Sequence, residues 1–449
     1  MKPTPDPTAD LYQVRQSIAN GQVHLAEPLE RALQACEQPS CRHVYVVGAQ
    51  AELRQAINRA GHHSPAPPRP LAGLPVSVKD LFDVAGQSTR AGSVVLQGPA
   101  ATQDCPAVAR VRAAGGLIAG RTNMTEFAFS GVGINPHHGT PVNPADSHTP
   151  RIPGGSSSGA AVSVALGAAW LALGSDTGGS LRIPAALCAL VGFKSTARLV
   201  PTEGAVPLST TLDTVGAITR SVRDAVLAHE VLAQRRVQAS GRALAGARLA
   251  LARTWMLEDM DATVAQAFER SLRTLSAAGA HIEEIALEPI AELAQINAGG
   301  GFSAAESYAW HRPLLAQGAD QYDPRVAKRI LRGAQMSAAD YLDLLSARKR
   351  WIASMEQQLQ GYDAVISPTV PILAPPIAPL ERDDEAFFRV NALLLRNTSV
   401  VNMLDGCAIS LPCHTPDQLP VGLMLWQGAL HDDRVLELAG QVEAALAGR

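Results

Sequence analysis

The spacing of apolar residues predicts helices at the start of the chain. Within residues 8–60, Leu11, Val14 and Ile18 recur at intervals of three and four, which places them on one face of a helix. Residues 62–70 (HHSPAPPRP) interrupt this pattern with four prolines and predict a linker or a rim loop. We therefore expect a helical N-terminal segment, separated by this loop from the rest of the chain.

After this loop, short apolar runs alternate with helical periods. Residues 75–78 (PVSV) predict a strand that ends at Lys79. Residues 105–120 predict a helix that stops at two glycines and then a strand, and residues 160–173 predict a buried helix that runs into a strand. Because α/β folds assemble their sites at strand ends, we expect Lys79 and the segment 121–130 on the same rim of a sheet.

The second half of the chain continues this alternation and indicates an α/β fold. The elements expected there are helices and strands over 221–290, polar helices over 300–360, a strand over 362–369 that leads into the proline-rich loop 368–379, strands at 408–412 and 420–426, and a closing helix over 432–446.

Composition excludes several classes of protein. The 449 residues are 47% hydrophobic and 18% charged, with a net charge of −3, which gives no electrostatic reason to expect nucleic acid or an acidic membrane as a partner. No apolar segment reaches the roughly 20 residues that cross a bilayer, and the first 16 residues lack the apolar centre of a signal peptide. We expect a cytoplasmic protein.

The six cysteines indicate neither a metal site nor disulfides. None of them forms a C-x-x-C pair, and no histidine stands at zinc-ligand spacing from a pair of them. We expect no metal and no cofactor, and we interpret the cysteines as ordinary thiols of a reducing compartment.

Two turns rich in glycine and serine flank the apolar segment 160–173. The first turn is 154–159 (GGSSSG) and the second is 174–180 (GSDTGGS), followed by Leu-Arg-Ile-Pro. Pro184 suits the first turn of a helix, which we expect after Ser180 and through Leu190. Glycines let the backbone approach a ligand closely, and successive amides that point the same way can hold an anion. A serine in such a turn can act as a nucleophile or pass on a proton.

One interpretation makes Ser157 the nucleophile. Residues 155–159 match G-x-S-x-G, the nucleophile elbow of α/β-hydrolases. That motif requires a strand directly before it, but residues 146–153 contain two prolines and no strand pattern. It also requires a later histidine, and neither His414 nor His431 has a convincing setting. We therefore disfavour the elbow.

Longer motifs resemble the amidase signature family of serine amidohydrolases. The resemblance covers the chain from about residue 10 to the end. The segments that carry it are VSVKD (76–80), GRTNMTEFAFSGVGINPHHGTPVNP (120–144), PGGSSSGAAVSVA (153–165), LGSDTGGSLRIPAALCALVGFKSTARLVPTEG (173–204), LDTVGAITRSVRDA (212–225), YDAVISPTVPILAPP (362–376) and LPVGLMLW (419–426).

The resemblance implies the fold and its organisation. It implies an α/β fold with a mixed, twisted central sheet that helices cover on both faces. We expect an N-terminal helical segment, residues 1–65, packed on an amidase signature domain, residues 66–449, so that residues 10–449 form in effect one domain.

The resemblance also implies the roles of individual residues. The catalytic lysine falls on Lys79, the bridging serine on Ser156 and the nucleophile on Ser180, and the family spacing of 24 between the serines is kept (180 − 156 = 24). A cis peptide bond is implied between Gly155 and Ser156. The remaining implied roles are an oxyanion hole of the amides of Thr177, Gly178, Gly179 and Ser180, supporting roles for Asp176, Arg182 and Ser157, and an acyl pocket at Ala128, Phe129 and Ser130.

The chemistry of these residue types supports the implied roles. A lysine with a pKa near its usual value of about 10.4 is protonated at pH 7 and cannot act as a base. Burial among alanine- and glycine-rich segments would lower the pKa of Lys79. A neutral Lys79 could then take a proton from Ser180 through Ser156 and later return it to the leaving amine.

The substrate is less well defined by the sequence. We expect a small amide, with anilides, ureas and carbamates (urethanes) left open, and Phe129, Ile134, Val206 and Leu208 favour an apolar or aromatic portion. We expect no nucleic acid and no membrane as partner, and we leave a homodimer open.

Two other functions need to be weighed. A catalytically inactive binding module is disfavoured, because the three catalytic positions are all intact in this chain. The stronger alternative is the glutaminase (A) subunit of a glutamyl-tRNA(Gln) amidotransferase. Glutamine-specific members carry an aspartate seven residues before the position of Asn402, and this chain has Leu395 there.

Overall fold

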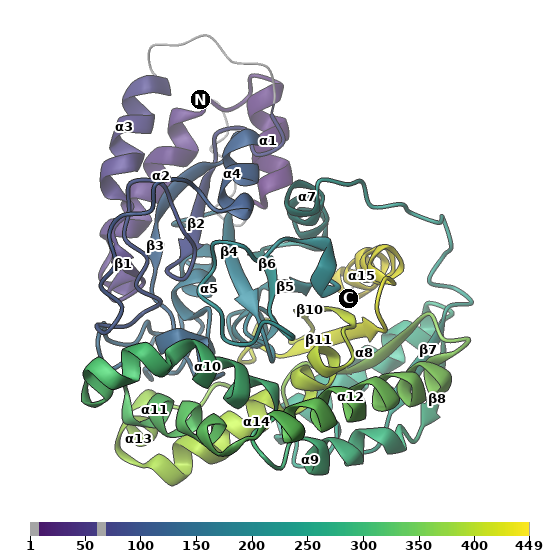
Figure 1. The fold of residues 1–449 in the computed structure, drawn as a ribbon. Coiled ribbons are helices and arrows are strands. Elements are labelled where there is room, and N and C mark those ends of the chain that lie inside the picture. Colours follow the sequence, from purple (N-terminus) through teal and green to yellow (C-terminus); the bar gives the residue numbers. More distant parts are fainter. Residues whose placement is uncertain (1–8, 61–68, 449) are drawn as a thin grey trace.

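One mixed sheet of eleven strands organises the molecule (Figure 1). The computed structural model describes residues 9–60 and 69–448. Within them the strand order is β1-β3-β2-β4-β6-β5-β10-β11-β9-β7-β8. Strand β2 is parallel to both β3 and β4, and β7 is parallel to β8 and β9, whereas the strands between these two groups pair antiparallel. The expected mixed sheet is confirmed.

The bounds of the elements are as follows. The strands are β1 (Tyr45–Val47), β2 (Pro75–Lys79), β3 (Leu117–Thr122), β4 (Leu171–Asp176), β5 (Val191–Lys194), β6 (Thr214–Thr219), β7 (Arg248–Ala252), β8 (His281–Ile285), β9 (Ala364–Pro368), β10 (Cys407–Pro412) and β11 (Gly422–Gln427). The α-helices are α1 (Leu11–Ala19), α2 (Ala26–Glu37), α3 (Gln50–Ala60), α4 (Pro106–Ala113), α5 (Ser158–Ala165), α6 (Arg182–Leu187), α7 (Val222–Ala233), α8 (Ala262–Ala277), α9 (Leu293–Ile296), α10 (Gly301–Gly318), α11 (Pro324–Leu331), α12 (Ala338–Leu359), α13 (Ile377–Arg382), α14 (Asp384–Met403) and α15 (Asp432–Ala447). Short 3-10 helices lie at Pro39–Cys41, Glu126–Ala128, Ala197–Leu199, Glu288–Glu292, Ala319–Gln321 and Arg332–Gln335.

Helices cover both faces of the sheet, and the strands are apolar on both faces as a result. In β7, Leu249 and Leu251 pack into the core on the side of α8 and α15, whereas Ala250 and Ala252 pack into a second core on the side of α12 and α14. Successive side chains of a strand point to opposite faces, so a strand that is covered twice must be apolar throughout. The same alternation continues through β9, β10 and β11.

The N-terminal helices complete the core at the other end of the sheet. Leu11 and Leu29, from α1 and α2, belong to the same buried cluster as Val76 and Val78 of β2. In Figure 1 these helices lie beside β1, β2 and β3, far from β7 and β8. Helices α10, α11, α13 and α14 gather at one edge of the fold, in the lower part of the same view.

Most of the elements predicted from the sequence are confirmed, with three differences. Strand β1 lies inside the segment predicted to be helical, and its pairing with β3 depends on residues far away in the chain. Helices α13 and α14 were not predicted. The helix expected after Ser180 ends at Leu187 instead of Leu190.

Two further predictions concern the loop at residues 62–70 and membrane-spanning segments. Residues 62–68 of the predicted loop lie outside the described residues. Within the described ranges 9–60 and 69–448, no helix combines the length and the apolar character needed to cross a membrane.

Candidate active site

Lys79 ends β2 and lies fully inside the protein. Its side chain has no exposed surface, because β2 lies between β3 and β4 and is buried along its whole length. Its Nζ donates hydrogen bonds to Ser156 Oγ at 2.7 Å and to Ser175 Oγ at 2.9 Å. No carboxylate of the described residues forms an ion pair with it. A lysine is thus held between two serine hydroxyls.

This environment changes the acidity of the lysine. Burial lowers the pKa of Lys79 to about 7, because an ammonium loses its hydration inside the protein. The negative charges of Asp176 and Asp213 act in the opposite direction and keep this pKa from falling further. Near neutral pH, a substantial fraction of Lys79 is therefore an uncharged amine that can accept a proton.

Ser156 follows a cis peptide bond from Gly155, as predicted. Only glycine fits at position 155, because a Cβ there would lie 2.7 Å from the backbone nitrogen of Gly133. Helix α5 begins two residues after Ser156, at Ser158. Ser157 is buried, and its Oγ lies 3.4 Å from the Ser175 carbonyl oxygen. No strand of the described residues directly precedes Gly155, which agrees with our rejection of the elbow.

Ser180 lies in the turn between β4 and α6. The turn leaves the sheet after Asp176 and enters α6 at Arg182. Gly179 has a φ of 135°, and a Cβ there would lie 2.2 Å from Thr398 Oγ1, so neither the backbone conformation nor the space accepts a side chain. Ser180 is 3% exposed and lines a cavity, which gives its hydroxyl access to a ligand.

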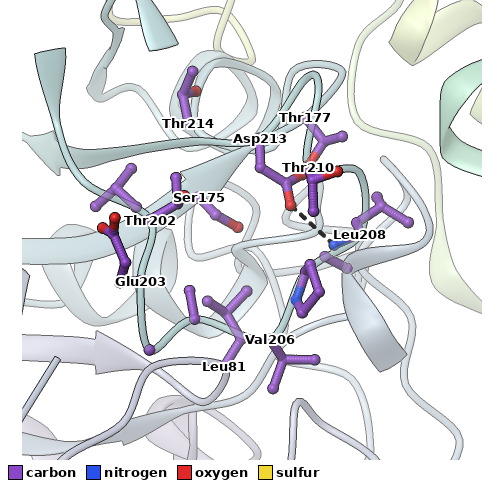
Figure 2. Close-up of a pocket in the computed structure, with 15 residues that line it drawn as sticks. Leu81, Ser175, Thr177, Thr202, Glu203, Val206, Leu208, Thr210, Asp213 and Thr214 are labelled. Atoms are coloured by element: carbon purple, nitrogen blue, oxygen red, sulfur yellow. Dashed lines mark hydrogen bonds between the residues drawn. The ribbon is translucent and has the colours of Figure 1, made fainter. Parts of the chain in front are cut away.

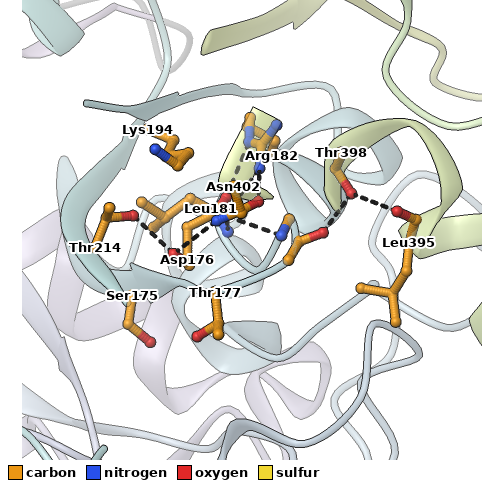
Figure 3. A network of polar contacts seen from close by, with 12 residues as sticks. Ser175, Asp176, Thr177, Leu181, Arg182, Lys194, Thr214, Leu395, Thr398 and Asn402 are labelled. Carbon is orange, nitrogen blue, oxygen red and sulfur yellow. Dashed lines mark hydrogen bonds and ion pairs between the residues drawn. The ribbon is translucent and has the colours of Figure 1, made fainter. Parts of the chain in front are cut away.

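The carboxylate of Asp176 holds this turn together (Figure 3). Arg182 donates to it through Nε and Nη2 at 3.0 and 2.9 Å, and the amides of Gly179 and Leu181 donate at 2.9 and 3.1 Å. Burial alone would raise the pKa of Asp176, but the charge of Arg182 and the hydrogen bonds from Arg182 and Asn402 lower it to about 2. The predicted supporting contact between Asp176 and Arg182 is thus a fully buried ion pair.

Helix α14 also contacts the turn between β4 and α6, through two polar side chains. Asn402 Nδ2 donates to Asp176 Oδ1 at 2.9 Å, and its Oδ1 accepts from Arg182 at 2.7 Å. Thr398 Oγ1 donates to the Gly178 carbonyl oxygen at 2.6 Å. Asn402 therefore contacts both ends of the turn, and Thr398, one helical turn earlier in α14, contacts its middle (Figure 3).

A second carboxylate, Asp213, holds the loop that follows β5 against the turn. Thr177 Oγ1 donates to Asp213 Oδ1 at 2.5 Å, and the amides of Leu208 and Ser209 donate to Oδ2. Burial raises the pKa of Asp213 to about 6. Asp213 lines a cavity of about 220 Å³ together with Ser175, the serine that accepts from Lys79 (Figure 2).

Ser180 itself opens onto another cavity, of about 340 Å³. Ala128, Phe129 and Ser130, which the sequence predicts as an acyl pocket, line it together with Thr177 and Gly178. Of the residues expected to make it apolar, Phe129 and Leu208 line it, whereas Ile134 is buried in a hydrophobic cluster and Val206 lines the cavity of Asp213.

Some residues of the site were not singled out in the sequence. Ser175, which accepts a hydrogen bond from Lys79, lies in the second serine-bearing turn, directly before Asp176. Its position in that turn could have marked it as a candidate. Asn391 accepts from Ser130 Oγ and from the amide of Gly131, and Arg329 and Arg332 line the cavity. These three come from segments more than 200 residues after Lys79, and no local pattern marks them. Among the described residues, no group of histidine, cysteine and acidic side chains is arranged to hold a metal ion.

Comparison with known proteins identifies the family. The family model Amidase matches residues 27–436, and the chain belongs to this family. A 2-amino-5-chloromuconic acid deaminase from Comamonas testosteroni is 36% identical over 84% of this chain and 82% of its own length. A glutamyl-tRNA(Gln) amidotransferase subunit from Symbiobacterium thermophilum is 32% identical over 82% of each chain. A crystal structure described as an amidase superposes with a TM-score of 0.86 and 32% identity, covering 97% of this chain and 99% of its own. The protein is therefore a hydrolase that acts on carbon–nitrogen bonds.

Proposed function

We propose that the protein hydrolyses the C–N bond of a small amide through an acyl-enzyme on Ser180, with Lys79 as the base and Ser156 as the proton relay. The observation that carries the proposal is the fully buried Lys79, whose pKa is lowered to about 7 and whose Nζ lies 2.7 Å from Ser156 Oγ. An uncharged amine in contact with a hydroxyl is the arrangement that general-base activation of a serine requires.

The reaction has two halves. In the first, Lys79 takes a proton from Ser156 while Ser156 takes one from Ser180, and Ser180 Oγ bonds to the carbonyl carbon. The C–N bond then breaks, and the proton returns from Lys79 through Ser156 to the leaving nitrogen. In the second half, water gives a proton to the same relay and its oxygen attacks the acyl carbon, which releases the acid and restores Ser180.

The negative oxygen that forms during each attack needs donors. The amides of Thr177, Gly178, Gly179 and Ser180 remain our proposal for these donors. The amide of Gly179 already donates to Asp176 Oδ1, so we rank it as the weakest of the four. Fixed donors need no reorganisation during the reaction, and the contacts of Asp176 and Thr398 keep the turn in place.

A glutaminase function is the second candidate, and the amidotransferase relative favours it. Glutamine carries an ammonium group, which needs a negative or strongly polar partner in its pocket. Leu395 lines the cavity of Ser180 at the position where glutamine-specific members carry an aspartate. None of the described residues that line this cavity is acidic. We therefore favour hydrolysis of a substrate other than glutamine. Release of ammonia from glutamine at a rate above that from other amides would reverse this preference.

The leaving group remains to be assigned among amides, anilides, ureas and carbamates. The name of the relative from Comamonas testosteroni describes removal of an amino group. We infer that primary amides, which release ammonia, are the first class to test. The experiment is a panel of primary amides, p-nitroanilides, ureas and carbamates, with Ser180→Ala as the control for every activity detected. Hydrolysis that persists in Ser180→Ala, or the absence of hydrolysis in the whole panel, would contradict the proposal.

The cytoplasmic location and the oligomeric state also remain proposals. All six cysteines are buried, and no disulfide joins them in the described part of the chain, which fits the reducing conditions of the cytoplasm. A homodimer remains open, and light scattering of the purified protein measures it directly.

A further inference from the structure

The cavity beside Ser180 contains positive charge without any matching negative charge. Among the described residues that line it, the only charged ones are Arg329, from α11, and Arg332, from the 3-10 helix that follows α11. Asn297, Asn391, Ser303 and Ser399 add neutral polar groups. A cavity with this lining attracts an anionic ligand and repels a cationic one.

The guanidinium of Arg329 is held in place by carbonyl oxygens instead of by a carboxylate. Its Nη2 donates to the Phe129 carbonyl oxygen, and its Nε lies 3.2 Å from the Arg325 carbonyl oxygen. Its Cζ lies 4.9 Å from the centre of the Phe129 ring, so the aromatic face supports the cation as well. Nη1 has no hydrogen-bond partner among the described residues.

The acids near Arg329 have other partners. Asp323 acts on Arg329 through its charge, but its side chain accepts from the Arg325 amide at the start of α11. The neighbouring Asp384 pairs with Arg325. Burial lowers the pKa of Arg329 to about 10, which still leaves it charged at neutral pH. A half-buried cation without an ion-pair partner is costly unless a ligand supplies the anion.

Arg332 adds a second cation on the exposed side of the same cavity. Its Nη2 donates to the Ala298 carbonyl oxygen at 3.2 Å, and no carboxylate of the described residues pairs with it. The lining also includes the apolar residues Phe129, Leu212, Phe302, Leu395 and Met403. The cavity therefore combines a serine hydroxyl, hydrocarbon surface and two cations.

We propose that the substrate is a monoanionic half-amide of a dicarboxylic acid, whose free carboxylate binds Arg329 and Arg332 while its amide carbonyl lies at Ser180. This inference depends on the proposed hydrolysis and specifies its substrate class. A planar guanidinium suits a carboxylate because it can offer two parallel donors. None of the described residues that line this cavity is acidic, so nothing in its lining compensates an ammonium group next to that carboxylate.

Three pairs of primary amides test the charge preference on the wild-type protein. The half-amides of succinic, glutaric and adipic acid are each compared with the neutral amide in which a methyl group replaces the carboxylate: butanamide, pentanamide and hexanamide. We expect kcat/KM for at least one half-amide to exceed that of its neutral partner by about tenfold to hundredfold, the range of a charge-assisted hydrogen bond. Glutamine, which is the glutaric half-amide with an added ammonium group, is expected to react more slowly than the half-amide itself.

Substitutions of single residues identify which side chains cause the preference for a substrate with a carboxylate. Arg329→Gln is expected to bring the ratio of kcat/KM between a half-amide and its neutral partner close to one, and Arg332→Gln to lower the ratio by a smaller factor. Lys328→Gln removes the same charge from an exposed position of the same helix and should leave the ratio unchanged. A merely structural role of Arg329 would lower both rates together and keep the ratio. If Arg329→Gln does not fold, the wild-type pairs and Arg332→Gln still decide.

The outcomes separate this proposal from the proposed function. Neutral amides that react as well as their half-amides, in a reaction that Ser180→Ala abolishes, would overturn the carboxylate site and leave the hydrolase function intact. Glutamine that matches or exceeds the glutaric half-amide would overturn the expected discrimination against an ammonium group. Failure of both series and of the anilides, ureas and carbamates would instead contradict the proposed hydrolysis itself.

Discussion

Lys79 Nζ lies 2.7 Å from Ser156 Oγ, and both residues are fully buried. The two groups come from elements that are far apart in the chain, the end of β2 and the turn before α5. Their contact couples an amine whose pKa is lowered to about 7 to a hydroxyl in the segment that resembles a catalytic motif. An uncharged amine in this contact can take a proton from the hydroxyl.

The rate should depend on the protonation of Lys79. Only the neutral amine accepts a proton, so kcat/KM is expected to rise with pH and to level off above a midpoint near 7. Lys79→Ala should reduce kcat by about 10²-fold or more, because it removes the general base. Initial rates between pH 5 and pH 9 measure both effects. A profile that is flat across this range would show that another group is the base.

Ser180 and Ser157 should respond differently to substitution. Ser180→Ala is expected to abolish turnover, because it removes the attacking oxygen. Ser157→Ala removes a buried hydroxyl near the Ser175 carbonyl oxygen and should leave measurable activity. Steady-state assays of the two purified variants on one amide make the comparison, and the reverse result would favour the nucleophile elbow at residues 155–159.

The charge of Asp213 should set the midpoint of the pH profile. Its carboxylate raises the pKa of Lys79, so Asp213→Asn is expected to lower that pKa and to move the acid limb of kcat/KM to lower pH. The oxygen of an asparagine can still accept from the amides of Leu208 and Ser209, and its nitrogen can donate to Thr177 Oγ1, which keeps the turn attached. Glu203→Gln removes a carboxylate that lines the same cavity and serves as the control. A midpoint that stays in place in Asp213→Asn would contradict the coupling.

Breaking the buried ion pair of Asp176 should destabilise the fold. Arg182→Leu leaves a buried carboxylate without its counter-charge, and the free energy of unfolding is expected to fall by about 3–5 kcal/mol. Arg198→Leu breaks an exposed pair with Asp405 and should cost about 0–1 kcal/mol. Urea unfolding followed by circular dichroism compares the two variants. Equal losses would mean that the buried pair contributes no more than a surface pair.

The sequence was sufficient to predict the elements whose signals are local. The strand that ends at Lys79 and the buried helix and strand expected over 160–173 follow from short-range apolar patterns, although α5 begins at Ser158 and β4 continues to Asp176, into the predicted second turn. The catalytic positions Lys79, Ser156 and Ser180 were predicted from a long motif, because single serines and a single lysine carry little information by themselves. The resemblance also gave the cis bond at Ser156.

The rest of the site depends on packing between distant segments. Asn402 was noticed only as a position in a motif, and its contacts with Asp176 and Arg182 follow from how α14 crosses the turn. The apolar residues around Ser180 suggested an apolar pocket, whereas α11 brings Arg329 into it. A strand as short as β1 is stabilised by its partner β3 and has no strong pattern of its own.

The acyl-enzyme on Ser180 is the central claim, and trapping it tests that claim most directly. The protein is mixed with a hydrolysed amide, quenched in acid during turnover, digested and analysed by mass spectrometry. We predict the mass of the acyl group on the peptide that contains Ser180, and no adduct in Ser180→Ala. An adduct on Ser157 in the wild-type protein, or an adduct that persists in Ser180→Ala, would contradict the account.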